Sequence, residues 1–89
     1  MHDACMEKHA PTTDAVASEV RAEMGRQRKT QADLAAVLKI YPATAARRLD
    51  GSVPFDVVEL ATVARWLGVT ASELMARAER ALNDLAVSA

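Results

Sequence analysis

The sequence predicts an all-α protein, and three features of the chain lead to that prediction. Hydrophobic residues make up 51% of the 89 residues, but aromatic residues make up only 3%, and alanine is the commonest apolar residue. Alanine favours helices, whereas strands are rich in β-branched and aromatic side chains. Apolar residues also recur at intervals of three and four in five segments, several of which follow an N-cap residue or precede a glycine.

Length and residue content restrict the class of protein further. A chain of 89 residues corresponds to one domain with a single core. Its one cysteine, Cys5, cannot form an internal disulfide, and the chain has no CxxC pair of the kind that binds zinc. No apolar run approaches the ~20 residues of a membrane helix. We therefore expect a cytoplasmic protein with no cofactor, no metal, no small-molecule ligand and no membrane contact.

The first segment, residues 1–12, has no helical periodicity and is predicted to be a flexible arm. Its His2, Cys5 and His9 are potential metal ligands, but they lack a fourth ligand and a rigid frame. We therefore expect no metal site there, and we assign residues 13–89 to the folded domain.

The first helix should begin after Thr13, which is a suitable N-cap residue. Val16, Val20 and Met24 recur every four residues and form the inner stripe of this helix. The helix is expected to end near residue 27 or 28, where a run of polar and basic residues follows.

Two short helices joined by a tight corner are predicted next. Thr30 and Asp33 have the spacing of a capping box, so a helix should begin at Gln31. A proline at position 42 fits the first turn of a second helix over residues 42–49, and Gly51 suits the left-handed residue that ends it. Two such helices at a steep angle form a helix-turn-helix.

The second of these helices presents two different faces. Ala45 and Leu49 are four residues apart and are expected to face the core, while Ala43, Thr44 and Arg47 share the opposite side. Small side chains let a helix approach a surface closely, and a guanidinium can donate two parallel hydrogen bonds to a guanine edge. This face is therefore suited to the major groove of DNA.

Two more helices are expected downstream of the corner. Asp56 and Glu59 form a second capping-box pattern before a helix over residues 57–67, which Gly68 should end. In the last helix, residues 71–86, four apolar residues have heptad-like spacing and suggest a contact between two helices. These are Met75, Ala78, Leu82 and Leu85. The contact is either with a second copy of the chain or with the helix's own domain.

The segment around the corner resembles the Cro/C1-type helix-turn-helix family of phage repressors, and most closely the repressor-like proteins of actinobacterial phages and prophages. The residues that carry the resemblance are Gln31, Leu34, Ala35, Thr44, Arg47 and Gly51. The resemblance covers roughly residues 15 to 76. It implies a compact five-helix lambda-repressor-like DNA-binding domain, with the helix-turn-helix formed by the second and third helices. Lys39 departs from the family, in which glycine is common at the corner.

The distribution of charge agrees with nucleic-acid binding, although the net charge of the chain is −1. Residues 21–50 contain seven cations and three anions, whereas the rest of the chain contains four cations and nine anions. A basic segment that coincides with the helix-turn-helix can attract phosphate. Ordinary solvated surface charges are the alternative explanation.

We therefore expect a sequence-specific double-stranded DNA-binding transcriptional regulator, repressor or Cro-like, acting as a homodimer on a palindromic operator. Ala43, Thr44 and Arg47 are the expected base-reading residues. The expected phosphate-binding residues are Arg28, Lys29, Gln31, Lys39, Tyr41 and Arg48. The alternative is a protein-interaction module, such as an antitoxin or adaptor. No catalytic motif points to an enzyme.

Overall fold

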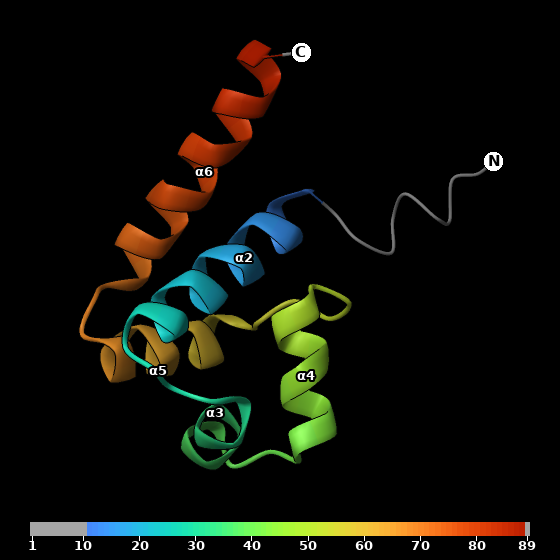
Figure 1. Cartoon of the computed structure of the whole chain (residues 1–89), viewed down its shortest axis with the longest axis vertical. Helices are drawn as coiled ribbons and strands as arrows, with labels where there is room; N and C mark the ends of the chain where they lie inside the picture. The colour runs from blue at the N-terminus through green and yellow to red at the C-terminus, as the bar shows by residue number, and fades with distance from the viewer. Residues whose placement is uncertain (1–10, 89) are drawn as a thin grey trace, which may run out of the picture.

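Five helices follow one another in the computed structural model, which describes residues 11–88, and none of the described residues forms a strand. Figure 1 shows the first of these helices in the middle of the molecule and the last one extending beyond the others. The helices are α2 (Pro11–Arg26), α3 (Gln31–Leu38), α4 (Pro42–Asp50), α5 (Val57–Leu67) and α6 (Ala71–Ser88). The predicted all-α fold is thus confirmed, with the helix-turn-helix at α3 and α4.

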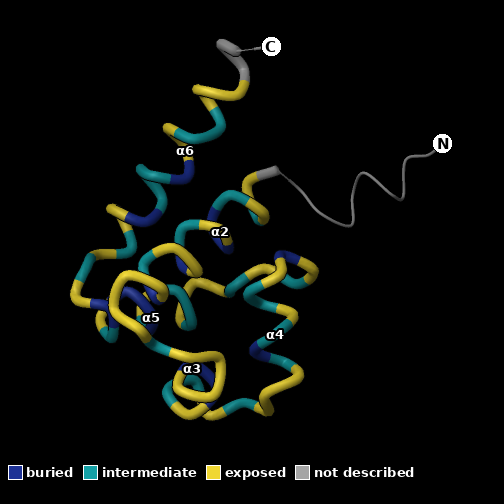
Figure 2. Tube along the Cα trace, in the orientation of Figure 1, coloured by how far each residue is buried: buried dark blue, intermediate teal, exposed yellow. Residues whose placement is uncertain are grey.

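One aliphatic core holds the helices together. Val20 of α2, Leu34 of α3, Val63 of α5 and Leu74 of α6 are the largest fully buried side chains. Burying each of them contributes roughly 1.5 to 3 kcal/mol relative to exposure. The buried segments of the trace face the other helices (Figure 2), and α2 packs against both α6 and α4. The position of α4 therefore depends on α2 as well as on α3.

The predicted caps define most of the helix ends. The Thr30 hydroxyl accepts a hydrogen bond from the Asp33 amide at 3.1 Å, and the Asp33 carboxylate accepts one from the Thr30 amide at 2.9 Å. A second capping box opens α5. Gly51 and Gly68 have φ angles of 86° and 78° and end α4 and α5. A Cβ atom at Gly51 would lie 2.4 Å from a carboxylate oxygen of Asp14 on α2.

Four predicted helix ends differ from the structure by one to three residues. One is the end of α4, which is Asp50 and not residue 49. The first helix begins at Pro11 and not after Thr13, because proline is compatible with the first turn of a helix. It ends at Arg26, since Arg28 takes a left-handed φ of 59° and the Lys29 amide bonds back to the Met24 carbonyl at 2.9 Å. The last helix continues to Ser88, beyond the predicted residue 86.

The predicted arm lies mostly outside the described residues. Its first ten residues, with His2, Cys5 and His9, are not described, and the rest of it begins α2. Within residues 11–88, no helix combines the length and the apolar character needed to cross a membrane.

Candidate nucleic-acid interface

The corner between α3 and α4 is built by backbone geometry. Lys39 follows the last residue of α3 with φ 58° and ψ 46°, which is a left-handed conformation, and its amide bonds to the carbonyls of Ala35 and Ala36. Tyr41 is then extended, with φ −71° and ψ 150°, and precedes the proline that opens α4. These two residues turn the chain sharply, so α3 and α4 pack against each other at a corner (Figure 1).

The outward face of α4 carries small residues around one long cation. Ala45 is completely buried and Leu49 packs against the core, as predicted. On the other side Ala43 and Arg47 are exposed and Thr44 is half-buried. No hydrogen bond or ion pair with another described residue engages the Arg47 side chain. Its guanidinium is therefore available to a ligand outside the protein.

Three side-chain contacts hold α4 in place, one each with α3, α2 and α5. Gln31 of α3 donates from Nε2 to the Pro42 carbonyl at 3.0 Å, at the start of α4. Arg21 of α2 donates from Nη1 to the Leu49 carbonyl in the last turn. Arg48, on α4 itself, donates to the Glu59 carboxylate of α5. Sequence reasoning missed Arg21 and the link to Glu59, because the partners are 28 and 11 residues apart along the chain.

The expected phosphate-binding residues fall into two groups. Arg28, Lys39 and Tyr41 are exposed, and 81% of the Tyr41 surface is accessible. The others are already in contact with the protein. Lys29 lies with its Nζ 4.9 Å from the centre of the Trp66 ring, and Gln31 and Arg48 make the contacts with Pro42 and Glu59 described above. Lys39 and Tyr41 form the corner that precedes α4, and Arg28 lies before the start of α3.

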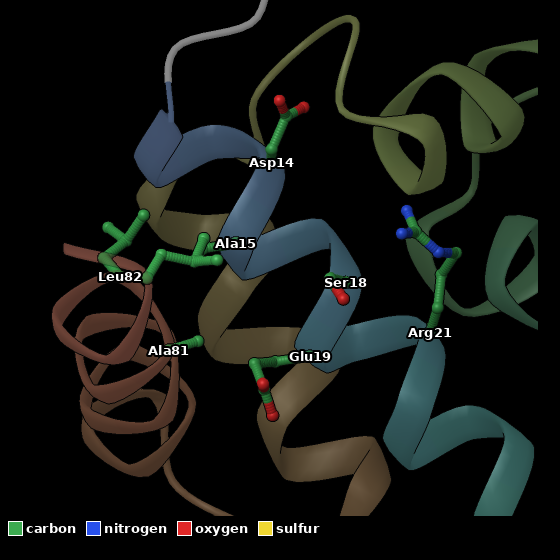
Figure 3. A pocket seen from close by; sticks show the side chains of 8 residues that line it. Asp14, Ala15, Ser18, Glu19, Arg21, Ala81 and Leu82 are labelled. Atoms are coloured by element: carbon green, nitrogen blue, oxygen red, sulfur yellow. The ribbon is translucent and has the colours of Figure 1, made fainter. Parts of the chain in front are cut away.

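The expected dimer contacts of α6 are also divided. Ala78 is completely buried in its own domain, and Met75 packs against the core. Leu82 is half-buried and Leu85 is 68% exposed. These two leucines line a groove of about 460 Å³ between α2 and α6. Figure 3 shows Ala15 of α2 across this groove from Ala81 and Leu82 of α6.

Comparisons with known proteins agree with this fold. A family model described as the BetR domain matches residues 8–86. Among solved structures, the chain is similar to the clp gene regulator ClgR from C. glutamicum, with a TM-score of 0.72 and 18% identity over 79% of this chain and 91% of ClgR. No curated protein sequence in the comparison matches the chain. At 18% identity, the likeness to ClgR shows a shared fold.

Proposed function

The chain belongs to the BetR domain family, and from this premise we propose that it is a sequence-specific transcriptional regulator of the repressor or Cro-like type that binds double-stranded DNA. The observation that carries the proposal is the outward face of α4, where small side chains surround an arginine that no described residue engages. Such a face fits the major groove, where α-helices read base edges. A solved gene regulator with the same fold supports the assignment to gene regulation.

In this proposal base reading is assigned to three residues of α4. Arg47 donates two hydrogen bonds to O6 and N7 of a guanine, which no other base offers in the same arrangement. Ala43, in the first turn, and Thr44 let the helix approach closely and contact a thymine methyl group. Bound α4 would then exclude other proteins from the operator, and repression would follow from this steric exclusion.

Phosphate binding is assigned to residues before and at the start of α3 and to the corner between α3 and α4. The Gln31 contact with the Pro42 carbonyl brings the first turns of α3 and α4 together. Amide groups at both helix starts carry partial positive charge and attract a DNA phosphate. Arg28, Lys39 and Tyr41 extend this surface with exposed donors. Lys29 joins them if its ammonium leaves Trp66.

A homodimer is part of the proposal, since a palindromic operator requires two-fold symmetry. The apolar stripe of α6 that begins in the core with Leu74 and Ala78 continues to Leu82 and Leu85, which the chain's own helices leave partly uncovered. A second copy would cover this end. Two recognition helices would then sit about 34 Å apart, which corresponds to half-sites about 10 base pairs apart.

Selection of bound duplexes from a random pool tests the proposed function. The expected result is a palindromic consensus with a guanine in each half-site. Affinity for that consensus should fall with salt, and the slope of log K against log salt should be about −5 to −7 if a dimer neutralises roughly six to eight phosphates. A pool that shows no enrichment, together with a flat salt titration, would rule the function out.

A further inference from the structure

The Glu59 carboxylate joins the recognition helix to the start of α5. Its Oε1 accepts the Asp56 amide at 3.0 Å and Arg48 Nε at 2.9 Å, and its Oε2 faces Arg48 Nη2 at 3.3 Å. The Arg48 and Glu59 side chains are only 17% and 15% exposed. A two-point contact between a guanidinium and a carboxylate fixes both position and orientation. The same carboxylate therefore closes the capping box of α5 and orients α4.

This geometry separates two neighbouring arginines of α4. Arg47 is exposed and makes no hydrogen bond or ion pair with another residue of the described range, whereas Arg48 is half-buried against α5. Two of the N–H groups of Arg48 are bonded to Glu59 and its side chain is only 17% exposed, so Arg48 would have to leave this position to present its guanidinium fully to a phosphate. A half-buried carboxylate would then remain without its cation, close to the negative charge of DNA, and an uncompensated charge of this kind is costly.

We propose that Arg48 is a positioning residue, which sets the angle of the recognition helix through Glu59 and does not bind phosphate. The inference rests on the proposed DNA-binding function. Arg47 follows the movement of its own helix, so a small rotation of α4 displaces its guanidinium from a guanine edge. Loss of the Arg48 contact would therefore weaken discrimination between sequences more than it weakens general affinity for DNA.

Glu59→Gln distinguishes the two roles of Arg48 because they predict opposite changes. Glutamine retains the capping-box hydrogen bond but removes the charge that holds Arg48. For a positioning Arg48, affinity for the consensus duplex from the random pool should fall about five-fold, and affinity for a shuffled duplex should change less than two-fold. For a phosphate-binding Arg48, the released guanidinium should tighten binding to both duplexes. Tighter binding to both would overturn the inference.

The salt dependence of Arg48→Gln gives a second, independent measurement. Removing a phosphate contact makes the slope of log K against log salt shallower by about 0.9 per arginine, or about 1.8 for a dimer. A positioning Arg48 leaves this slope unchanged, and the preference for the consensus falls as in Glu59→Gln. The double variant should then be no worse than either single variant, since both remove one contact. A shallower slope would overturn the inference.

Matched controls account for the change of charge and for folding. Glu79→Gln removes an acid from an exposed position on α6 and should leave the preference for the consensus unchanged. Lys39→Gln, at an expected phosphate contact, should make the slope shallower. If Arg48→Gln does not fold, Arg48→Lys keeps the charge but loses the two-point geometry. A positioning role predicts a lower preference in this variant, and wild-type preference would overturn the inference.

The outcome for the wild-type chain separates this inference from the proposed function. If the wild-type chain shows no preference for any duplex, the DNA-binding function is wrong. If it prefers the consensus but Glu59→Gln tightens binding or Arg48→Gln flattens the salt slope, only the role given to Arg48 is wrong.

Discussion

Lys39 occupies a backbone conformation that costs free energy for every residue except glycine. Its φ of 58° lies in the left-handed region, which costs an L-residue about 1 to 2 kcal/mol. Glycine avoids this cost but loses more conformational freedom on folding. We therefore expect Lys39→Gly to be about 0.5 to 1 kcal/mol more stable than Lys39→Ala in denaturant titrations. Both variants remove the same cation, so both should lose the same affinity for DNA. Equal unfolding midpoints in denaturant for the two variants would contradict this prediction.

Arg47 and Arg28 allow base reading and phosphate binding to be compared directly. Both side chains are exposed. Arg47→Ala should cost about 1 to 3 kcal/mol on the consensus duplex and relax the preference at one base position, because a bidentate contact to guanine is lost. Arg28→Ala should weaken consensus and shuffled duplexes alike and make the salt slope shallower. Competition binding with single-base variants of the consensus measures both effects. Equal losses for Arg47→Ala on both duplexes would exclude base reading.

The sequence allowed local features to be predicted well, because their partners are three or four residues apart. Thr30 with Asp33, Asp56 with Glu59, and the two helix-ending glycines all follow rules of this short range. The contacts that hold α4 did not follow from any such rule. Glu59 was identified as a cap, but its contact with Arg48 depends on how α4 and α5 cross, which tertiary packing determines. For the same reason the contact of Arg48 with α5 did not follow from the sequence.

At the level of helices, Glu23 links α2 to α6. Its carboxylate accepts hydrogen bonds from Arg26, the last residue of α2, at 2.8 Å and from the following Gln27 at 2.9 Å. It also accepts one from Arg77 of α6 at 2.9 Å. These hydrogen bonds lower the pKa of Glu23 from 4.5 to about 2. The bond from Arg26 has the largest effect, followed by those from Gln27 and Arg77. Arg77 also bonds Glu73 at 2.8 Å, so its guanidinium spans two carboxylates.

This network predicts how stability depends on acid. The pKa of Glu23 is lower in the folded chain than in the unfolded one, so its contribution is complete above about pH 4.5 and is lost as pH falls toward 2. Glu23→Gln should therefore be about 1 to 2 kcal/mol less stable than wild type at pH 7, and the difference should shrink below pH 4.5. Unfolding by denaturant at several pH values measures this. Glu79→Gln, at an exposed site on α6, should match wild type throughout. A difference for Glu23→Gln that persisted at pH 2 would contradict the role of the ionised carboxylate.

The whole molecule combines a basic segment with an otherwise acidic chain. Residues 21–50 hold most of the cations and include the end of α2, all of α3 and all of α4. The remaining segments carry an excess of anions. Charge of one sign on the elements of the helix-turn-helix, with the opposite sign elsewhere, would favour one orientation of approach to DNA. Net charge alone concealed this arrangement, because the two parts nearly cancel.

The surface that forms the proposed dimer can be identified by comparing two exposed apolar residues. Leu85 lies in the groove between α2 and α6, and Val57 lies in a second groove between α5 and α6. They are 68% and 84% exposed, so a charge at either site should leave the fold intact. Leu85→Glu places a charge in the proposed interface, where burial without a partner is unfavourable, and should weaken dimerisation at least ten-fold. Val57→Glu should not change it.

Sedimentation and DNA binding together measure the consequence for the assembly. With Leu85→Glu, the chain should sediment as a monomer at concentrations where wild type is a dimer. In a dimer, binding of one half-site raises the effective concentration of the second recognition helix at the other half-site. A monomer lacks this gain, so its affinity for the palindrome should fall toward that for a single half-site. Inserting about five base pairs, half a helical turn, between the half-sites should weaken wild-type binding but leave Leu85→Glu unaffected. If Val57→Glu produced the monomer instead, the contact between copies would lie on α5, and the recognition helices would have to be related by a different two-fold axis.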